Sequence, residues 1–258
     1  MDTLKRFYRN VLQNRLAFVS GTHEDRIHSL ELESHLATVQ YNDFILTDAI
    51  RPSLALAVIP QQGYKFEQTE KHCDYEGRSR RDTEQKGQSE RVRSRWSSPI
   101  LGISVSLESL FDVFLELLTP LGDTVHAALD TSHRYTGRYR ADLHREHIDL
   151  PVLKSFLYEY EDLLLNDGCT GISVFSPKIR TEVRLDEHKL IFVRAHTRRS
   201  GAFLPFEDIL RKNHVDFNAT MPLLTDAEHV HITREEYAQR FKSLQMSLGM
   251  DESFLPAR

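Results

Sequence analysis

Residues 171–195 constrain the fold more than any other part of the chain. Residues 171–176 predict a strand, residues 181–186 alternate apolar with polar side chains, and residues 189–195 are almost continuously apolar. Strands joined this closely form an antiparallel hairpin, and a strand with two apolar faces belongs near the middle of a sheet. We therefore expect a β-sheet centred on this stretch, with helices packed against it.

The clearest helical pattern lies upstream, between two predicted strands at 100–105 and 124–130. Ser106 is the expected N-cap of the intervening helix. The apolar face of that helix contains Leu107, Leu110, Phe111, Phe114, Leu117 and Leu118. This order predicts a β-α-β unit whose two strands are parallel and whose connection is right-handed.

Further helices are expected after this unit. Asp149 caps one with Pro151 in its first turn, and 166–168 ends it. Another is predicted at 205–212, and a terminal helix follows a capping box at 233–236. The expected class is α/β or α+β, with a mixed β-sheet, a β-α-β unit and an antiparallel hairpin in the C-terminal half, flanked by helices.

The domain organisation depends on a polar segment at 64–98. Basic residues outnumber acidic ones in its middle and aliphatic residues are almost absent, so it cannot bury enough apolar surface to offset its ordering entropy. We prefer a single domain, 1–258, with 64–98 as a mobile insertion. The alternative is a boundary between 1–63 and 99–258, but the N-terminal piece is small and weakly patterned for a stable core.

Charge and composition exclude some classes of protein. The net charge of −5 disfavours a general nucleic-acid binder, although local RNA contact through 78–95 and the tyrosine- and arginine-rich loop within 130–147 is a third hypothesis. Cys73 and Cys169 form no CxxC pair, which leaves zinc-ribbon and thioredoxin-like sites without support. No apolar run has the length of a membrane span, and 1–15 fits a surface helix better than an organelle presequence. The expected location is cytoplasmic.

The richest polar segment is 130–147, which starts at the end of a predicted parallel strand, where α/β sheets bind ligands. Arginine forks bind phosphate or carboxylate, and tyrosine rings stack on bases. The predicted ligand-binding residues are Arg134, Arg138, Tyr139 and Arg140. The first hypothesis is a non-catalytic binding or regulatory protein, without a cofactor, that binds an anionic small molecule or an acidic protein surface here. The alternative is an exposed loop whose arginines pair with acidic neighbours.

The same segment carries a second hypothesis, a metal-dependent hydrolase. His144 and His147 would share one side of a helical turn, with Asp130 and His133 as further ligands. A metal-bound water would be the nucleophile and Glu146 a general base. Because 13 histidines make such pairs common by chance and no HExxH motif occurs, we expect no metal.

Two further segments are weaker candidates. On a strand, His229 and His231 would point the same way and could share a metal. Val230 and Ile232 indicate instead that this polar side faces water, so no metal is expected there either. The arginines and glycine of 196–201 could assist anion binding, although a solvated connection is the simpler interpretation.

Overall fold

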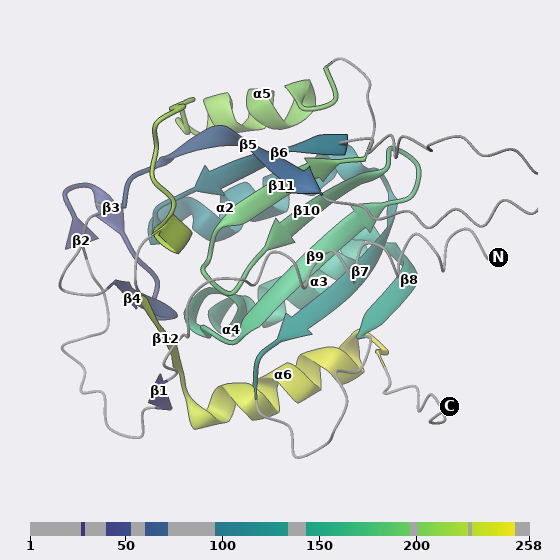
Figure 1. Ribbon diagram of the computed structural model, residues 1–258. Coiled ribbons are helices and arrows are strands. Elements are labelled where there is room, and N and C mark those ends of the chain that lie inside the picture. The colour runs from purple at the N-terminus through teal and green to yellow at the C-terminus, as the bar shows by residue number, and fades with distance from the viewer. Residues whose placement is uncertain are drawn as a thin grey trace, which may run out of the picture.

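The computed structural model describes residues 27–28, 40–52, 60–71, 96–133, 143–196, 201–226 and 229–250 (Figure 1). The strands are β1 Ile27–His28, β2 Gln40–Tyr41, β3 Phe44–Ile45, β4 Ile50–Pro52, β5 Gly63–Lys71, β6 Trp96–Ser104, β7 Thr124–Thr131, β8 His144–Asp149, β9 Thr170–Ser176, β10 Thr181–Leu185, β11 Ile191–Ala195 and β12 His229–Thr233. The helices are α2 Leu107–Leu117, α3 Leu150–Glu159, α4 Glu161–Asn166, α5 Leu204–Lys212 and α6 Glu235–Ser247, with short 3-10 turns η2 Thr119–Leu121 and η3 Leu224–Asp226.

Most strands join one sheet, here called the large sheet. In the described ranges it has seven strands in the order β5-β6-β11-β10-β9-β7-β8, and every neighbouring pair is antiparallel. The predicted hairpin is confirmed as β10 and β11, which pair from Thr181 opposite Ala195 to Leu185 opposite Ile191. An antiparallel sheet with helices packed on it confirms the α+β class.

The predicted β-α-β unit is present, but its strands are not neighbours. Because direction alternates along the sheet, β6 and β7 run the same way, and β11, β10 and β9 lie between them. The ligand site at 130–147 was expected because the carboxyl ends of parallel strands meet at one edge. That reason does not hold here, since the neighbours of β7 run in the opposite direction.

The core lies between the large sheet and its helices. Helices α2, α3 and α4 cover one face, while α5 lies toward the β5 edge of the sheet and α6 toward the β8 edge (Figure 1). Val183 and Leu185 of β10 are fully buried on the helix-covered face, so the predicted alternation of this strand is confirmed. The opposite face carries Glu182 and Arg184. This face therefore holds the polar side chains of the sheet centre.

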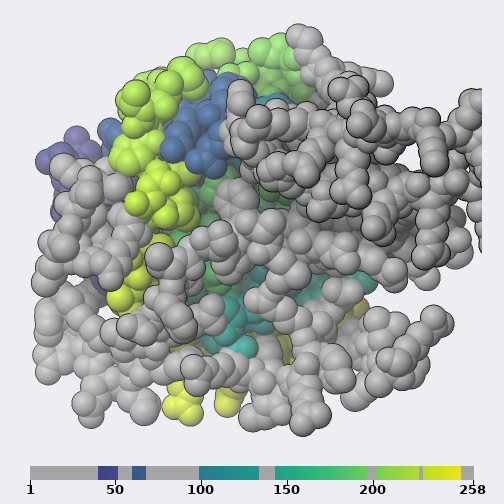
Figure 2. All heavy atoms as spheres, viewed as in Figure 1, coloured from purple at the N-terminus to yellow at the C-terminus, as the bar shows by residue number. Residues whose placement is uncertain are grey.

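A segment after α5 covers part of the second face. Met221 and Leu223 pack there against Ile100 of β6 and Phe192 of β11. The backbone nitrogen of Tyr64 also donates to the carbonyl of Asp216 at 3.0 Å. Figure 2 shows this segment as a yellow-green band beside the blue atoms of β5. Both faces of β11 are thus covered, as its continuous apolar sequence predicted.

Helix boundaries depart from the expectations in two places. The single helix expected after Asp149 is two helices, α3 and α4, because the backbone leaves the helical region at Tyr160 (φ −110°, ψ 21°). Pro151 does lie in the first turn of α3. The capping box at 233–236 is wrong, since Thr233 ends β12 and Arg234 is the N-cap of α6, which has no side-chain capping bond.

Ser106 occupies the predicted N-cap position of α2, but its side chain does not cap the helix. Its Oγ instead accepts a hydrogen bond from the backbone nitrogen of Ile45, at 3.0 Å. The side chain thereby ties the segment that contains β3 to the start of the helix. A tertiary contact has taken the place of the local one.

The strand β12 belongs to a small sheet with the order β1-β12-β4 in the described residues. Gly168, just before β9, connects the small sheet to the large one, because its backbone nitrogen donates to Ile232 at 2.8 Å. Ile232 in turn donates to Ala49 at 2.8 Å. A Cβ at Gly168 would lie 2.3 Å from the carbonyl oxygen of Ala49. Only glycine allows this approach.

Two expectations reach beyond the described ranges. The ends of the predicted insertion, 64–98, form the paired strands β5 and β6, while 72–95 lies outside the described residues. The N-terminal helix expected at 1–15 also lies outside them. Among the helices that the structure describes, none combines the length and apolar character needed to cross a bilayer.

Candidate metal centre

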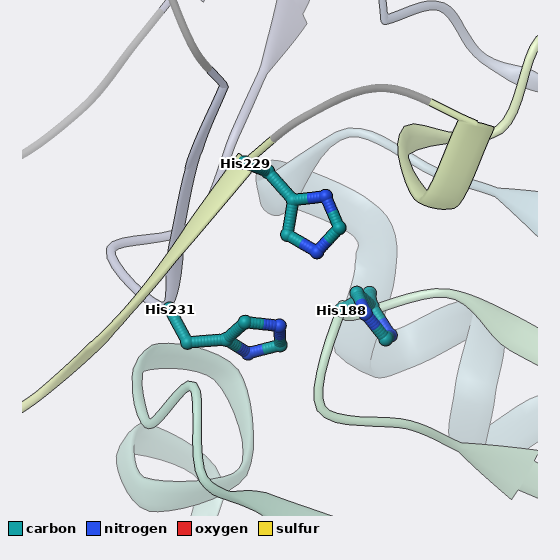
Figure 3. Close-up of side chains that lie close together, drawn as sticks. All are labelled: His188, His229 and His231. Atoms are coloured by element: carbon teal, nitrogen blue, oxygen red, sulfur yellow. The ribbon is translucent and has the colours of Figure 1, made fainter. Parts of the chain in front are cut away.

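Three imidazoles meet where the small sheet approaches the large one. His188 lies in the turn between β10 and β11, while His229 and His231 lie two residues apart on β12. Alternate residues of a strand share a face, so both β12 rings point the same way. Figure 3 shows these rings turned toward His188. The ring centroids are 4.7 Å apart for His188 and His231, 5.0 Å for His188 and His229, and 5.1 Å for His229 and His231.

The spacing of the three rings suits a single metal ion. One ligand nitrogen of each of His188, His229 and His231 lies within 4.8 Å of the other two. Zinc–nitrogen bonds of about 2.0–2.1 Å in a tetrahedral site place ligand nitrogens about 3.4 Å apart. Closing the group around an ion would therefore move each ring by no more than about 1 Å.

Hydrogen bonds set the tautomers of two of these rings. Nδ1 of His188 lies 2.9 Å from Oδ2 of Asp186, and Nδ1 of His231 lies 2.7 Å from the carbonyl oxygen of Gly168. Both oxygens only accept, so each Nδ1 carries the proton in the neutral ring and each Nε2 offers a lone pair. A carboxylate or carbonyl behind a histidine is the usual arrangement around a bound metal, because it fixes the ring and raises its basicity.

The carboxylate of Asp186 is itself held in place. Its Oδ1 accepts the backbone nitrogens of His188, at 2.9 Å, and Leu190, at 3.0 Å. Burial alone would raise the pKa of this carboxyl, but His188, the charge of Arg184 and the Leu190 bond keep the pKa below its usual value. Asp186 therefore stays ionised and remains an acceptor for the His188 ring.

The site is shielded from bulk water. His231 is buried, His188 and His229 are partly buried, and the Nε2 atoms of His229 and His231 are inaccessible to solvent. Next to His188, a cavity of about 20 Å³ is lined also by Thr47, Ser104, Lys189 and apolar side chains, but not by His229 or His231. A cavity of this size holds about one water molecule.

This donor set determines which ions fit. Neutral imidazoles suit zinc, copper, nickel and iron, whereas magnesium and calcium need oxygen ligands. A tetrahedral zinc ion with three protein ligands keeps its fourth position for water, and the ion lowers the pKa of that water to about 7. The arrangement can therefore bind a transition-metal ion and supply a hydroxide nucleophile.

A second group of potential ligands lies at the sheet edge and consists of His126, Glu146 and His147. His126 of β7 faces a β-bulge in β8, and the backbone nitrogen of His147 donates to its Nδ1 at 3.2 Å. In the neutral ring the proton is then on Nε2, so neither nitrogen of His126 is available to a metal. Burial, reinforced by His147, lowers the pKa of His126. This group fits an ion less well than the first.

A third group, His133, Asp167 and Cys169, is entirely buried. Nε2 of His133 lies 2.8 Å from Asp167, whose carboxylate also accepts the hydroxyl of Thr170 and, at 3.2 Å, the backbone nitrogen of Cys169. Burial would raise the pKa of Asp167, but the hydrogen bond and charge of His133 lower it. These hydrogen bonds occupy both carboxylate oxygens, which indicates a structural role.

The residues of the hydrolase hypothesis lie in separate places. Asp130 forms an ion pair of 3.6 Å with Arg184, and His133 pairs with Asp167 as described above. The predicted helical turn at 144–147 is wrong, because these residues belong to strand β8. Of its two histidines, only His147 joins a potential ligand group in the described part of the chain. The candidate general base Glu146 joins the same group.

The residues of the anion hypothesis cannot be placed. Arg134, Arg138, Tyr139 and Arg140 lie in 134–142, outside the described residues, and so does 197–200 within the weaker candidate at 196–201. The anion site at 130–147 stays a prediction from the sequence.

The sequence predicted that His229 and His231 would share one face of a strand, but His188 was not recognised as the third residue of the group. The signal for it was Asp186 two residues before His188, a carboxylate within reach of an imidazole on one tight turn. Nothing local to this turn indicates β12, which lies 41 positions further along the chain, from 188 to 229.

Searches against models of protein families, against curated proteins and against solved structures found no match to this chain.

Proposed function

We propose that the chain is a metal-binding protein in which His188, His229 and His231 bind one divalent transition-metal ion, with zinc as the reference ion. The observation that carries this proposal is the convergence of three imidazoles, two of which already present an Nε2 lone pair. A set of three neutral histidines leaves the positive charge of the ion in place, which favours an additional water or anionic ligand.

Metal-assisted hydrolysis is the second candidate function, and it requires the metal ion of the first proposal. The observation that favours it is the set of three imidazoles, because three protein ligands leave one position of a tetrahedral zinc ion for water. In this candidate function, His188, His229 and His231 replace the ligands expected from the sequence, which were Asp130, His133, His144 and His147. The metal would supply the hydroxide nucleophile there.

The other expectations from the sequence remain part of this proposal. An anionic small molecule or an acidic protein surface would contact Arg134, Arg138, Tyr139 and Arg140, and the location would be cytoplasmic. Asp130 already forms an ion pair with Arg184, and His133 a hydrogen bond with Asp167, so the ligand contacts would come from the arginines and the tyrosine.

The metal proposal is tested by stoichiometry. The full chain is stripped with a chelator, dialysed against zinc and analysed for bound metal, in parallel with His188→Ala and His147→Ala. The second variant is the matched control, because it removes a histidine from the competing group at the sheet edge. We expect about one zinc ion per chain for the wild type and the control, and none for His188→Ala.

Cobalt substitution adds the geometry, because tetrahedral Co²⁺ absorbs visible light far more strongly than octahedral Co²⁺. A strong visible band in the wild type and in His147→Ala, absent from His188→Ala, is the expected result. A wild type that binds no ion, or a His188→Ala variant that binds as well as the wild type, would refute the assignment.

The hydrolase candidate has a separate test on the zinc-loaded chain. Carboxylic and phosphoric p-nitrophenyl esters report hydrolysis through the released nitrophenolate. Turnover that needs zinc and disappears in His188→Ala supports the candidate. Stoichiometric zinc without zinc-dependent turnover of either ester removes the hydrolase and leaves the metal-binding proposal intact.

A further inference from the structure

We infer that Asp186 is a positioning residue of the metal centre, because it decides which nitrogen of His188 carries the proton. The inference rests on the proposed function, since the Nε2 lone pair of His188 has a role only if the site binds a metal ion. The tautomer itself can be observed without metal, so the two ideas can fail separately.

The turn between β10 and β11 holds the carboxylate in one orientation. The backbone nitrogen of Asp186 donates to Leu190 at 3.0 Å, and its carbonyl accepts Lys189 at 3.1 Å. Its Oδ1 accepts the backbone nitrogens of His188 and Leu190, at 2.9 and 3.0 Å. Only Oδ2 faces the imidazole of His188. With the side chain anchored by two backbone donors, this second oxygen cannot turn away without breaking the turn.

The chemical consequence follows from what each atom can donate. An ionised carboxylate has no proton, so Nδ1 of His188 must provide the hydrogen of the 2.9 Å contact. A neutral imidazole carries one proton, so Nε2 keeps its lone pair. The opposite tautomer would point an N–H at the ion and would leave a buried carboxylate oxygen facing a lone pair.

The Asp186 side chain has two roles: it accepts the backbone hydrogen bonds of the turn, and it accepts the Nδ1 proton of His188. Asparagine at this position separates them. Its amide oxygen can replace Oδ1 and keep both backbone bonds of the turn. Its NH₂ group then replaces Oδ2 and donates toward Nδ1 of His188, which moves the ring proton to Nε2. Asp186→Asn thus preserves the shape and most of the hydrogen bonds of the turn while it removes the lone pair that a metal needs.

The structure provides two controls. His231 has the same tautomer for a different reason, since its acceptor is the backbone carbonyl of Gly168, which Asp186→Asn does not change. Glu187 is the neighbouring carboxylate, but it accepts the hydroxyl of Ser132 at 3.1 Å. Glu187→Gln therefore removes the same charge from the same turn and should leave the His188 ring unchanged.

The experiment is long-range ¹H–¹⁵N correlation NMR of the metal-free ¹⁵N-labelled chain in alkaline buffer, at a pH where the ring ¹⁵N shifts show one protonated and one unprotonated nitrogen. We expect His188 and His231 of the wild type and of Glu187→Gln to be protonated on Nδ1. In Asp186→Asn, His188 should be protonated on Nε2 while His231 is unchanged. Zinc affinity should fall about 10- to 100-fold in Asp186→Asn.

The possible results separate failure of the inference from failure of the proposed function. Nε2 protonation of His188 in the wild type overturns the inference even if the asparagine variant does not fold. An unchanged His188 tautomer in a folded Asp186→Asn variant overturns it as well. The expected tautomers without zinc binding would confirm that Asp186 sets the tautomer of His188, and would refute the proposed metal site instead.

Discussion

Zinc should stabilise the fold, and the size of the effect can be worked out from the arrangement of its ligands. The ion would join His188, in the turn after β10, to His229 and His231, on β12 of the small sheet. These positions lie 41 residues apart, from 188 to 229, so the unfolded chain does not hold the site together. Binding energy gained only in the folded state appears as free energy of unfolding.

The expected stabilisation forms a graded series. At a free zinc concentration of 100 times the wild-type Kd, linkage adds about 2.7 kcal/mol to the free energy of unfolding. For a chain of this size that corresponds to a rise in Tm of roughly 5–11 °C. If Asp186→Asn weakens binding about 10- to 100-fold, the same zinc concentration adds only about 0.4–1.4 kcal/mol. His188→Ala should gain about zero.

The assay is thermal unfolding with and without zinc, with each variant compared only with its own metal-free form. This comparison is needed because His188→Ala also destabilises the metal-free chain directly, by leaving the buried Asp186 without its contact to the imidazole. The zinc-induced change in Tm excludes that direct effect. His147→Ala is again the control and should show the wild-type shift. Equal zinc-induced shifts in the wild type and in His188→Ala would mean that the ion binds elsewhere, and the reasoning would fail.

Three further predictions concern the structure around the centre. Because the pKa of Asp167 is lowered in the folded chain, its pairing with His133 contributes stability above the unfolded pKa near 3.8, and this is lost as pH falls through the lower folded value. Asp167→Asn should therefore cost about 3–5 kcal/mol in urea unfolding at neutral pH, with a flatter pH dependence below about 4. Gly168→Ala should destabilise the chain by about 1–3 kcal/mol or more, since its Cβ would meet the Ala49 oxygen at 2.3 Å. The carbonyl of residue 168 accepts from His231, so a shift of this backbone should also weaken zinc binding measured by titration. Tyr237→Phe should cost about 0.5–1.5 kcal/mol in the same unfolding assay, because the buried hydroxyl donates to Asp162 at 3.4 Å; a loss within error would contradict that reading of the contact.

Much of the fold was predictable because burial leaves a local trace in the sequence. The alternation at 181–186 placed Val183 and Leu185 inside, and the continuous apolar run at 189–195 placed β11 near the sheet centre. Local capping patterns were less reliable. The Ser106 hydroxyl bonds to Ile45, 61 residues away, instead of to its own helix. A polar side chain takes whichever donor the folded chain brings near it, and that donor need not be local.

The candidate centre was half predictable. A period of two residues places His229 and His231 on one face of a strand, and this part was anticipated from the sequence. The expectation that this face meets water was drawn from Val230 and Ile232, which report only on the opposite side. What lies across from β12 is the turn bearing His188, and no local pattern encodes that meeting.

Most of the helices, the central strands and their apolar faces could be predicted from the sequence, because side-chain periods of two and 3.6 residues can be read within a single segment. The tertiary structure alone decided the order of the strands, the antiparallel sheet and the meeting of His188 with β12. These features depend on which buried faces pack together across long separations, down to the hydrogen bond from Gly168 to Ile232 of β12, which joins the two sheets.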